Sequence, residues 1–306
     1  MESYQNQSKT VSVALCTYNG ERFLEEQLNS IIDQDYQELT EIICVDDNST
    51  DQTFQILELF AKKDNRIKIF KNDTNLGYVK NFEKALKLCT NSYIAISDQD
   101  DIWHHNKISI LINSIGDSLM VYSDNEYVDE TNNSLNKRFS DIRKLGTCRS
   151  CLNFALYNSI SGHVMLINRN LLNYCLPFRI EIPFDYWLAF HAAQHSEIPF
   201  VNEVLVRYRQ HSSNVIGALG LKHGKRKSNH KEYEFQLLKL LGSSLDEKLL
   251  YEKDVFKVLI DTFLDKSFKS RHQKVKTFIR NRKTLLFFKK KNNLRQIFYC
   301  LKLYWS

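Results

Sequence analysis

Short apolar runs and helical stretches alternate along the first hundred residues of the chain. Apolar, β-type runs predict four buried strands, at residues 11–17, 41–45, 66–70 and 93–97. Apolar residues at helical spacing predict helices between them, at residues 21–32, 49–62 and 79–88. Strands that alternate with helices in this way form a parallel sheet with right-handed crossovers. The first part of the chain therefore predicts an α/β fold, with a mostly parallel sheet flanked by helices.

The pattern changes after residue 103 and again near residue 221. Strands are predicted at residues 119–123, 161–167 and 201–208, and a helix at residues 184–193. The polar segment 125–149 predicts a loop-rich, mobile flap. Later stretches predict long basic helices, with amphipathic parts at residues 235–241 and 255–264. We therefore divide the chain into an α/β domain, residues 1–220, and a basic α-helical region, residues 221–306.

Polar side chains follow three of the predicted strands at their carboxyl ends. They are Thr17, Tyr18 and Asn19, then Asp46, Asp47 and Asn48, and finally the stretch from Asp98 to Asp101. Ligands of parallel sheets bind at this edge. Ser49 followed by Gln52 predicts a capping box for the helix that begins there. We expect the functional site along this edge.

Composition limits the class of protein. The chain has 306 residues, of which 43% are hydrophobic, enough for one substantial core and an appendage. No apolar stretch approaches the length of about 20 residues that spans a bilayer, and the first residues lack the features of a signal peptide. The seven cysteines are odd in number and irregularly spaced, and the lone pair Cys148 and Cys151 does not indicate zinc or redox chemistry. A cytoplasmic protein with reduced thiols is expected.

Charge is distributed unevenly along the chain. Residues 1–220 carry 20 Lys and Arg against 28 Asp and Glu, whereas residues 221–306 carry 22 against 8, giving net charges of −8 and +14. Basic clusters lie at residues 222–231 and 269–295, and the end of the chain mixes aromatic and cationic residues. Such a region can bind nucleic acid or an anionic membrane, or can simply be a solvated helix face. Two functional surfaces are expected.

The segment 93–103, YIAISDQDDIW, ends a predicted strand in three carboxylates. Like charges this close repel one another and raise one another's pKa. A cation is therefore expected beside Asp98, Asp100 and Asp101, and a divalent metal is the simplest candidate. Mg²⁺ takes one or two carboxylates and completes its shell with substrate phosphates. The segment predicts a metal-assisted site for a phosphorylated ligand.

Two residues at the other strand ends permit two interpretations each. Asp47 either caps a helix or accepts the N3–H of a uracil or thymine ring. Tyr18 is either an exposed turn residue or a stacking surface for a base. The chain contains no P-loop, dinucleotide-binding, nucleophile-elbow or HExxH motif, which removes the common enzyme classes that rely on them.

Later candidates also permit two interpretations. Asp185 follows Pro183 and precedes an aromatic helix, so it is either an N-cap or a desolvated general base. His211, at the end of a strand, is either structural or a third metal ligand facing the acidic cluster. Arg207 and Arg209 share one face of that strand and would either bind phosphate or provide surface charge.

Together these stretches resemble family 2 glycosyltransferases of the GT-A fold, in particular the bacterial rhamnosyltransferase-like group. The resemblance covers residues 10–216, in the order VALCTYNGERFLEEQLNSI, IICVDDNSTDQT, NDTNLGYVKNFEKAL, SDQDDIWHHNKI, FDYWLAF and YRQHSSNV. The set is far more specific than any one stretch, and SDQDDIW is the most specific of them.

The resemblance implies a role for each matching residue. Asp98, Gln99 and Asp100 match the DXD motif, in which Asp100 would bind Mg²⁺ or Mn²⁺ and Asp98 the ribose or donor sugar, with Asp101 extending the motif. Asp185 matches the general base, and His211 a metal or diphosphate contact. The other implied contacts to the nucleotide sugar are Thr17, Tyr18, Asn19, Asp47, Lys80, Gly162 and Arg209. His163, directly after Gly162, marks a departure from the family pattern, so acceptor contacts in that region are not assigned.

The implied activity is inverting, metal-dependent transfer of L-rhamnose from dTDP-L-rhamnose to a hydroxyl of a growing, lipid-linked cell-surface glycan. Alternatives are a UDP-hexose donor, a non-catalytic nucleotide-sugar or glycan-binding relative, and a nucleotidyltransferase that would release pyrophosphate. For such an enzyme, the basic region favours peripheral contact with an anionic membrane, on the inner face of a bacterial cell membrane, over nucleic acid.

Overall fold

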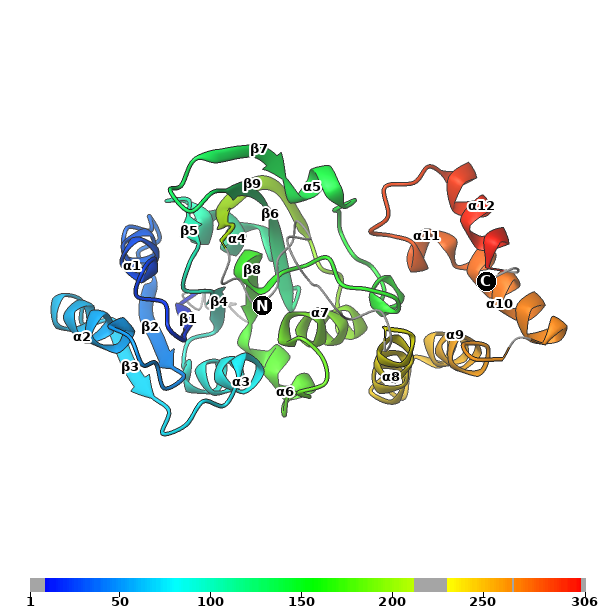
Figure 1. Ribbon diagram of the computed structural model, residues 1–306, viewed down its shortest axis with the longest axis horizontal. Helices are drawn as coiled ribbons and strands as arrows, with labels where there is room; N and C mark the ends of the chain where they lie inside the picture. Colours follow the sequence, from blue (N-terminus) through cyan, green and yellow to red (C-terminus); the bar gives the residue numbers. More distant parts are fainter. Residues whose placement is uncertain (1–8, 212–229, 266, 304–306) are drawn as a thin grey trace, which may run out of the picture.

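The computed structural model describes residues 9–211, 230–265 and 267–303. The predicted division of the chain at residue 220 lies outside these residues, as does most of the basic cluster 222–231. Figure 1 shows a sheet with helices packed around it, and a group of C-terminal helices beside α7, on the side of the molecule away from α1 and α2.

The first part of the chain alternates strand and helix, as the sequence predicts. The elements are β1 (Val11–Thr17), α1 (Leu24–Ile32), β2 (Leu39–Asp46), α2 (Thr53–Lys63), β3 (Ile67–Lys71), α3 (Tyr78–Leu88) and β4 (Tyr93–Ser97). Strands β3, β2, β1 and β4 lie side by side and pair in parallel, with Ala14 opposite Ile43 on one side and Ile96 on the other. Because these strands are parallel, their carboxyl ends meet at one edge of the sheet, which we call the carboxyl edge.

The second part of the sheet is mixed. Its elements are β5 (Ile102–Trp103), α4 (Lys107–Ser114), β6 (Met120–Val128), β7 (Ser134–Arg138), α5 (Phe139–Ile142), η1 (Cys151–Phe154), η2 (Gly162–Val164), β8 (Met165–Asn168), η3 (Arg169–Leu171), α6 (Leu172–Cys175), α7 (Phe184–His195) and β9 (Phe200–Arg209). Among the described residues the strand order is β3-β2-β1-β4-β8-β6-β9-β5, with β7 paired to β6. Strand β8 runs antiparallel to β4 and β6, while β9 runs parallel to β6. The expected α/β fold is confirmed.

The structure corrects three predictions of local structure. The first part of the predicted strand 161–167 forms the 3₁₀ helix η2, and only β8, which begins at Met165, is extended. About half of the predicted loop-rich flap 125–149 is regular secondary structure, because β6 extends to Val128, β7 forms a hairpin with it and α5 follows. All residues of β7 are exposed, so no apolar alternation marks the strand. The predicted capping box is also absent, since the Ser49 hydroxyl donates to Asp46, and the N–H of Gln52 donates instead to the Glu21 carboxylate, 2.8 Å away.

The predicted basic helices are α8 (His230–Ser243), α9 (Leu250–Asp261), α10 (Phe268–Arg280), α11 (Arg282–Leu285) and α12 (Asn293–Lys302). They pack on the α/β part through apolar contacts. The ring of Phe256 lies 5.8 Å from that of Phe190 in α7, and Phe288 lies 5.4 Å from Phe154 in η1. In the part of the chain that the structure describes, every helix is too short or too polar to cross a bilayer.

Candidate active site

The carboxyl edge is held together by side chains that link neighbouring strand ends. The Thr17 hydroxyl donates to Asp46, at 2.9 Å, and so joins β1 to β2. The Gln99 amide joins the loop after β4 to β1, since it accepts from the N–H of Tyr18 at 2.8 Å and donates to its carbonyl at 3.0 Å. A Cβ on Gly20 would overlap this amide, so glycine permits the close approach. These bonds fix the ends of β1, β2 and the loop after β4 relative to one another.

Asn19 and Tyr18 occupy different roles at the end of β1. Asn19 has a left-handed backbone, with φ at 49°, and its side chain accepts a hydrogen bond from the N–H of Thr50 at 2.9 Å. Its own N–H donates to Ser49, at 2.9 Å. The Tyr18 ring is about half exposed beside this turn. An exposed ring at the carboxyl edge is the arrangement that a stacking surface for a base requires.

Asp47 is buried and already engaged with the chain. Its carboxylate accepts hydrogen bonds from the Asn72 amide at 2.7 Å, from the N–H of Leu76 at 2.8 Å and from the N–H of Gly77 at 2.9 Å. These contacts fix the loop that leads into α3. Asp47 therefore stabilises this loop rather than capping the helix that follows β2. The second interpretation, contact with a base, stays a prediction.

Asp98 and Asp101 face one imidazole. Nδ1 of His163 lies 3.5 Å from a carboxylate oxygen of each. One ligand atom from each of these three side chains falls within 4.8 Å of the others, a spacing that could hold a metal ion. Oδ2 of Asp101 and Nε2 of His163 are buried and have no hydrogen-bond partner among the described residues. These three side chains therefore form a candidate metal centre. The sequence prediction assigned the metal to two other residues, Asp100 and His211.

Burial and charge act in opposite directions in this cluster. Burial raises the pKa of Asp101, and the nearby His163 opposes part of that shift. Burial alone would lower the pKa of His163, but the carboxylates of Asp101 and Asp98 outweigh it, so the net shift is upward. The two acidic side chains therefore favour the protonated form of the His163 imidazole.

A buried lysine underlies the same cluster. Nζ of Lys107 donates to the carbonyl of His163 at 2.6 Å and lies 3.3 Å from the centre of the Trp103 ring. Burial lowers the pKa of Lys107, while Asp101 and Asp98 raise it. Sequence reasoning missed both Lys107 and the contacts of His163. The sequence around Lys107, at the start of an apolar helix, does not indicate that the lysine is buried. His163 was noted only because it follows Gly162, and its contacts were not predicted.

The structure brings His211 to Asp100, as one of its two interpretations required. Nε2 of His211 lies 2.9 Å from Oδ2 of Asp100, and the imidazole packs against the ring of Phe23, with centroids 4.7 Å apart. Residues 212–229, which follow directly, lie outside the described part of the chain. His211 is therefore adjacent to the acidic cluster, and its role as metal or diphosphate ligand stays a prediction.

Arg209 is buried, which counts against direct contact with phosphate. Its guanidinium donates to the carbonyls of Asp100 at 2.9 Å and Glu130 at 2.8 Å, and it pairs with the Glu26 carboxylate. It also lies over the Phe23 ring. The alternation of side chains along β9 predicted which face of the strand carries Arg209. It did not predict that Glu26 of α1 would pair with this arginine. The Arg209 side chain therefore stabilises the acidic loop by binding the backbone carbonyl of Asp100.

Asp185 is the second residue of α7 rather than its cap. Pro183 precedes the helix, and the Asp185 carboxylate accepts a hydrogen bond from the N–H of Tyr186 at 2.6 Å. Burial raises the pKa of Asp185 to about 7, and the carboxylate of Asp98 contributes to the rise. The carboxylates of Asp98 and Asp185 are therefore close enough to influence one another electrostatically. A carboxylate with this pKa is suited to accept a proton near neutral pH.

Gly162 sets the position of the helix that carries Asp185. A Cβ at Gly162 would lie 2.7 Å from Cζ of Phe184, closer than real contacts allow. The Phe184 ring in turn stacks on Phe82 of α3, with centroids 4.1 Å apart. The missing side chain at Gly162 therefore lets the start of α7 approach the sheet.

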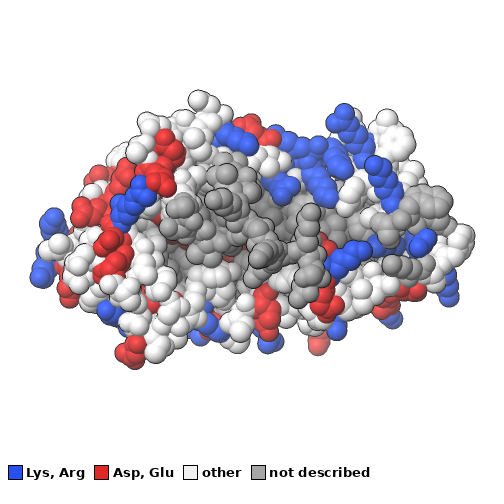
Figure 2. Space-filling view, in the orientation of Figure 1, with Lys and Arg blue, Asp and Glu red and all other residues white. Residues whose placement is uncertain are grey.

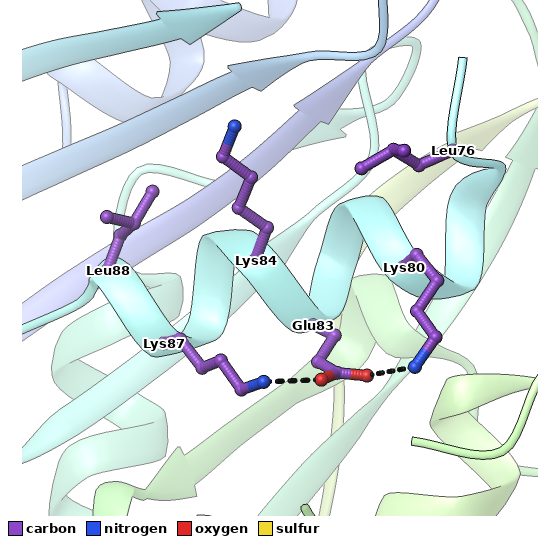
Figure 3. A pocket seen from close by; sticks show the side chains of 6 residues that line it. All are labelled: Leu76, Lys80, Glu83, Lys84, Lys87 and Leu88. Atoms are coloured by element: carbon purple, nitrogen blue, oxygen red, sulfur yellow. Dashed lines mark hydrogen bonds and ion pairs between the residues drawn. The ribbon is translucent and has the colours of Figure 1, made fainter. Parts of the chain in front are cut away.

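Lys80 lies apart from the acidic cluster. It pairs with Glu83 at 2.7 Å and donates to the carbonyl of Phe178 at 3.1 Å. Figure 3 shows Lys80 and Lys87 turned toward Glu83 along α3, in a cavity of about 450 Å³ lined also by Leu76, Lys84 and Leu88. This cavity lies along α3, and none of the strand-end carboxylates lines it. No contact of Lys80 with the predicted nucleotide-sugar site is present in the described residues.

Comparison with known proteins gives a consistent family. A family model described as glycosyl transferase family 2 matches residues 12–173, which is more than half of the chain. An uncharacterized glycosyltransferase of Haemophilus influenzae is 31% identical over 219 residues, spanning 66% of this chain and 66% of that protein. The chain thus spans just under two thirds of the length of that relative.

Two further relatives have more specific descriptions. The Escherichia coli protein WfgD, a UDP-Glc:α-D-GlcNAc-diphosphoundecaprenol β-1,3-glucosyltransferase, is 28% identical over 212 residues, covering 67% of this chain and 79% of that protein. The Shigella flexneri dTDP-rhamnosyl transferase RfbG is 41% identical over 106 residues, covering 33% of this chain and 36% of that protein. The similarity to RfbG is thus higher but covers a shorter part of the chain.

Among solved structures, residues 1–349 of S. aureus TarS in complex with UDP-GlcNAc match with a TM-score of 0.61. The match covers 90% of this chain and 81% of that chain at 18% sequence identity. At this identity the likeness shows that the fold is shared.

Proposed function

This chain belongs to glycosyl transferase family 2, and we propose that it moves one sugar from a nucleoside diphosphate to a hydroxyl of a lipid-linked glycan, with inversion at the anomeric carbon. The observation that carries the proposal is the placement of Asp185 beside the acidic cluster. Its pKa, raised to about 7 mainly by burial, suits a base that works next to a charged donor.

The chemistry assigned to the residues is a single displacement. Asp185 takes the proton of the acceptor hydroxyl, and the acceptor oxygen forms a bond to the anomeric carbon as the bond to the diphosphate oxygen breaks. The nucleoside diphosphate leaves with the bonding electron pair. The configuration inverts because the acceptor attacks from the face opposite the leaving group. No covalent intermediate with the enzyme is needed.

A divalent cation fits the residues of the acidic cluster. Oxygen ligands are available from Asp98, Asp100 and Asp101, and the buried Oδ2 of Asp101, which accepts no hydrogen bond from the described residues, is an atom that a ligand could satisfy. His163 and His211 lie against these carboxylates and are the candidate nitrogen ligands. Mg²⁺ or Mn²⁺, when bound, would offset the charge that develops on the departing diphosphate.

For the donor we propose a pyrimidine nucleotide sugar, with dTDP-L-rhamnose first and a UDP-hexose second. The exposed ring of Tyr18 would stack on the base, and Thr17, Asn19 and Asp47 form the surrounding strand ends. The relative RfbG supports dTDP-rhamnose over one third of the chain, whereas WfgD supports UDP-glucose over two thirds of it. The choice between them is the first question for experiment.

For the acceptor we propose a glycan carried on a polyprenyl diphosphate, because WfgD is described as acting on such a substrate. An enzyme with this acceptor would work at the inner face of the bacterial cell membrane. The strongly basic region 221–306 favours contact with anionic lipid there. We do not assign nucleic acid as a partner.

The decisive experiment is thermal stabilisation by dTDP-rhamnose, UDP-glucose, UDP-galactose and UDP-N-acetylglucosamine, each with Mn²⁺ and with a chelator. A ligand that binds only the native state raises the melting temperature by mass action. We expect one donor to stabilise the protein only when Mn²⁺ is present, and the effect to disappear in Asp100→Ala. Stabilisation by none of the donors would contradict the proposal.

Product analysis separates the alternatives. A glycosyltransferase releases a nucleoside diphosphate from the stabilising donor, whereas a nucleotidyltransferase releases pyrophosphate. A non-catalytic relative would bind the donor and release neither when supplied with a membrane extract that contains lipid-linked acceptors. Release of the nucleoside diphosphate, dependent on Asp185, is the expected result.

A further inference from the structure

Helix α12 (Asn293–Lys302) carries apolar side chains on the face turned away from the protein. Its inward face presents Gln296 and Cys300, both buried. The side chains of Leu294, Phe298 and Leu301 are exposed by 62%, 56% and 46%. These positions recur at the spacing of one helix face. Surface helices of globular proteins usually bury their apolar face, so α12 has the opposite arrangement.

Cations lie along one side of this apolar face and before its N-terminal end. We call the face the α12 outer face and define it by Leu294, Phe298 and Leu301. Arg295 and Lys302 are exposed on the same helix, at angles adjacent to the outer face. The exposed Lys290 and Lys291 precede the helix. Figure 2 shows Lys and Arg side chains gathered on the part of the molecule formed by the C-terminal helices.

The sequence around the helix has no compensating negative charge. Residues 266–306 contain 13 Lys and Arg and no Asp or Glu. An occupant of the outer face must therefore be apolar where it meets the three side chains and anionic around them. A second copy of this chain docking through the same face would place cations against cations, which opposes association.

We propose that the α12 outer face docks on an anionic phospholipid bilayer, with Leu294, Phe298 and Leu301 in the boundary between headgroups and acyl chains. An interfacial helix needs an apolar face flanked by Lys and Arg, and α12 has both. Anionic headgroups attract basic residues near the surface with about 1 kcal/mol for each residue. The inward face of α12 packs on the protein, so one helix contacts the protein with one side and lipid with the other.

The segment that leads into α12 is bonded to the α/β part. The ring of Tyr299 lies 3.9 Å from Nζ of Lys289, which precedes the helix. The N–H of Lys144, in the α/β part, donates to the carbonyl of Phe288 at 3.0 Å. Asn153 in η1 donates to the carbonyl of Thr284 in α11 at 3.3 Å. Docking at the outer face would therefore hold the α/β part near the membrane as well.

This inference deepens the proposed function, because a lipid-linked acceptor gives the enzyme a reason to be at a membrane. The experiment is co-sedimentation of the full chain with vesicles of phosphatidylcholine alone and with added phosphatidylglycerol. We compare the native chain with the triple variant Leu294→Gln, Phe298→Gln, Leu301→Gln. The matched control is Leu59→Gln with Leu250→Gln, two leucines on α2 and α9 that are 54% and 71% exposed.

The expected result is binding to the anionic vesicles only, weakened about tenfold or more in the triple variant and unchanged in the control. A second variant, Arg295→Gln with Lys302→Gln, should lose about fivefold for each cation, and the loss should shrink at high salt. Equal binding of the native chain and the triple variant would overturn the inference. So would a dimer of the native chain in size-exclusion chromatography that the triple variant converts to monomer.

Donor binding separates this inference from the proposed function. All substituted side chains are exposed and lie outside the acidic cluster, so the triple variant should keep the native melting temperature and the native stabilisation by donor and Mn²⁺. Vesicle binding without any donor effect would refute the proposed function and leave the docking surface standing. A donor effect without vesicle binding would do the reverse.

Discussion

The imidazole of His211 and the carboxylate of Asp100 lie in direct contact, with Nε2 2.9 Å from Oδ2. Asp100 belongs to the loop after β4, and His211 follows β9. If both are ligands of one cation, His211→Gln should raise the Mn²⁺ concentration needed for donor-dependent stabilisation by about 10–100-fold. Thermal stabilisation at saturating donor, titrated with Mn²⁺, measures this. His195→Gln, a partly exposed histidine of α7, is the control, and an unchanged Mn²⁺ requirement in His211→Gln would exclude the role.

Asp185→Asn should abolish transfer while donor binding remains. The native rate should fall as the pH drops below about 7, because the burial that raises the pKa of Asp185 keeps its carboxyl protonated there. Transfer rates and donor-dependent stabilisation across pH 5–9 test both statements. Glu181→Gln, an exposed carboxylate just before α7, serves as the control. Turnover retained by Asp185→Asn would remove this residue as the base.

The same substitution should change stability with a defined sign. A carboxyl whose folded pKa is raised from about 4 to about 7 binds fewer protons when the chain unfolds, so its contribution to stability is lost as the pH rises through that interval. Asparagine does not titrate. The melting temperature of Asp185→Asn relative to the native chain should therefore be higher at pH 8 than at pH 4. A difference that does not vary with pH would show that the pKa is not raised.

His163 should stabilise the fold through its two acidic neighbours. His163→Leu removes the buried imidazole that lies against Asp98 and Asp101, and losing a buried polar partner of this kind costs about 1–3 kcal/mol. The double variant with Asp101→Asn should recover a large part of that loss, since the carboxylate is gone as well. Urea unfolding of the native chain, both single variants and the double variant measures the coupling. Additive losses would mean that the two side chains do not interact.

Gly162→Ala should destabilise the protein by about 1–3 kcal/mol, because the new methyl group would press on the Phe184 ring. Phe184→Leu in the same chain should relieve part of this cost. Gly146→Ala is the matched control, since a Cβ there would meet Phe287 at an ordinary distance of 3.4 Å. Melting curves for the four proteins decide the matter, and a Gly162→Ala variant as stable as Gly146→Ala would contradict the packing argument.

The strands predicted most accurately are those with a continuous buried run. β1 and β4 have the predicted bounds, because nearly every residue in them is apolar and buried on both faces of the sheet. β7 was missed for the opposite reason, since its side chains are all exposed and only backbone pairing with β6 makes it a strand. Hydrophobic periodicity detects a strand through its buried side chains. A strand such as β7, whose side chains are all exposed, therefore has no such periodicity.

The candidate site shows a similar division. The acidic stretch was evident because three carboxylates at a strand end need an explanation within the sequence itself. Lys107 and the contacts of His163 were not predicted, because their partners lie far away in the chain and only the fold unites them. Arg209 had the predicted strand position, but its enclosing side chains, Glu26 and Phe23, lie far away in the chain and could not be predicted.

The order of the strands has a consequence for synthesis of the protein on the ribosome. β5, which follows the acidic loop at once, pairs with β9, and Arg209 in β9 bonds to Asp100 across 109 positions of sequence. At about 5–20 residues per second, translation takes roughly 5–20 seconds to reach that arginine. During that interval the nascent chain carries the carboxylates without Arg209 or His211. The acidic loop therefore gains these two partners only after β9 has been synthesised and has paired with the sheet.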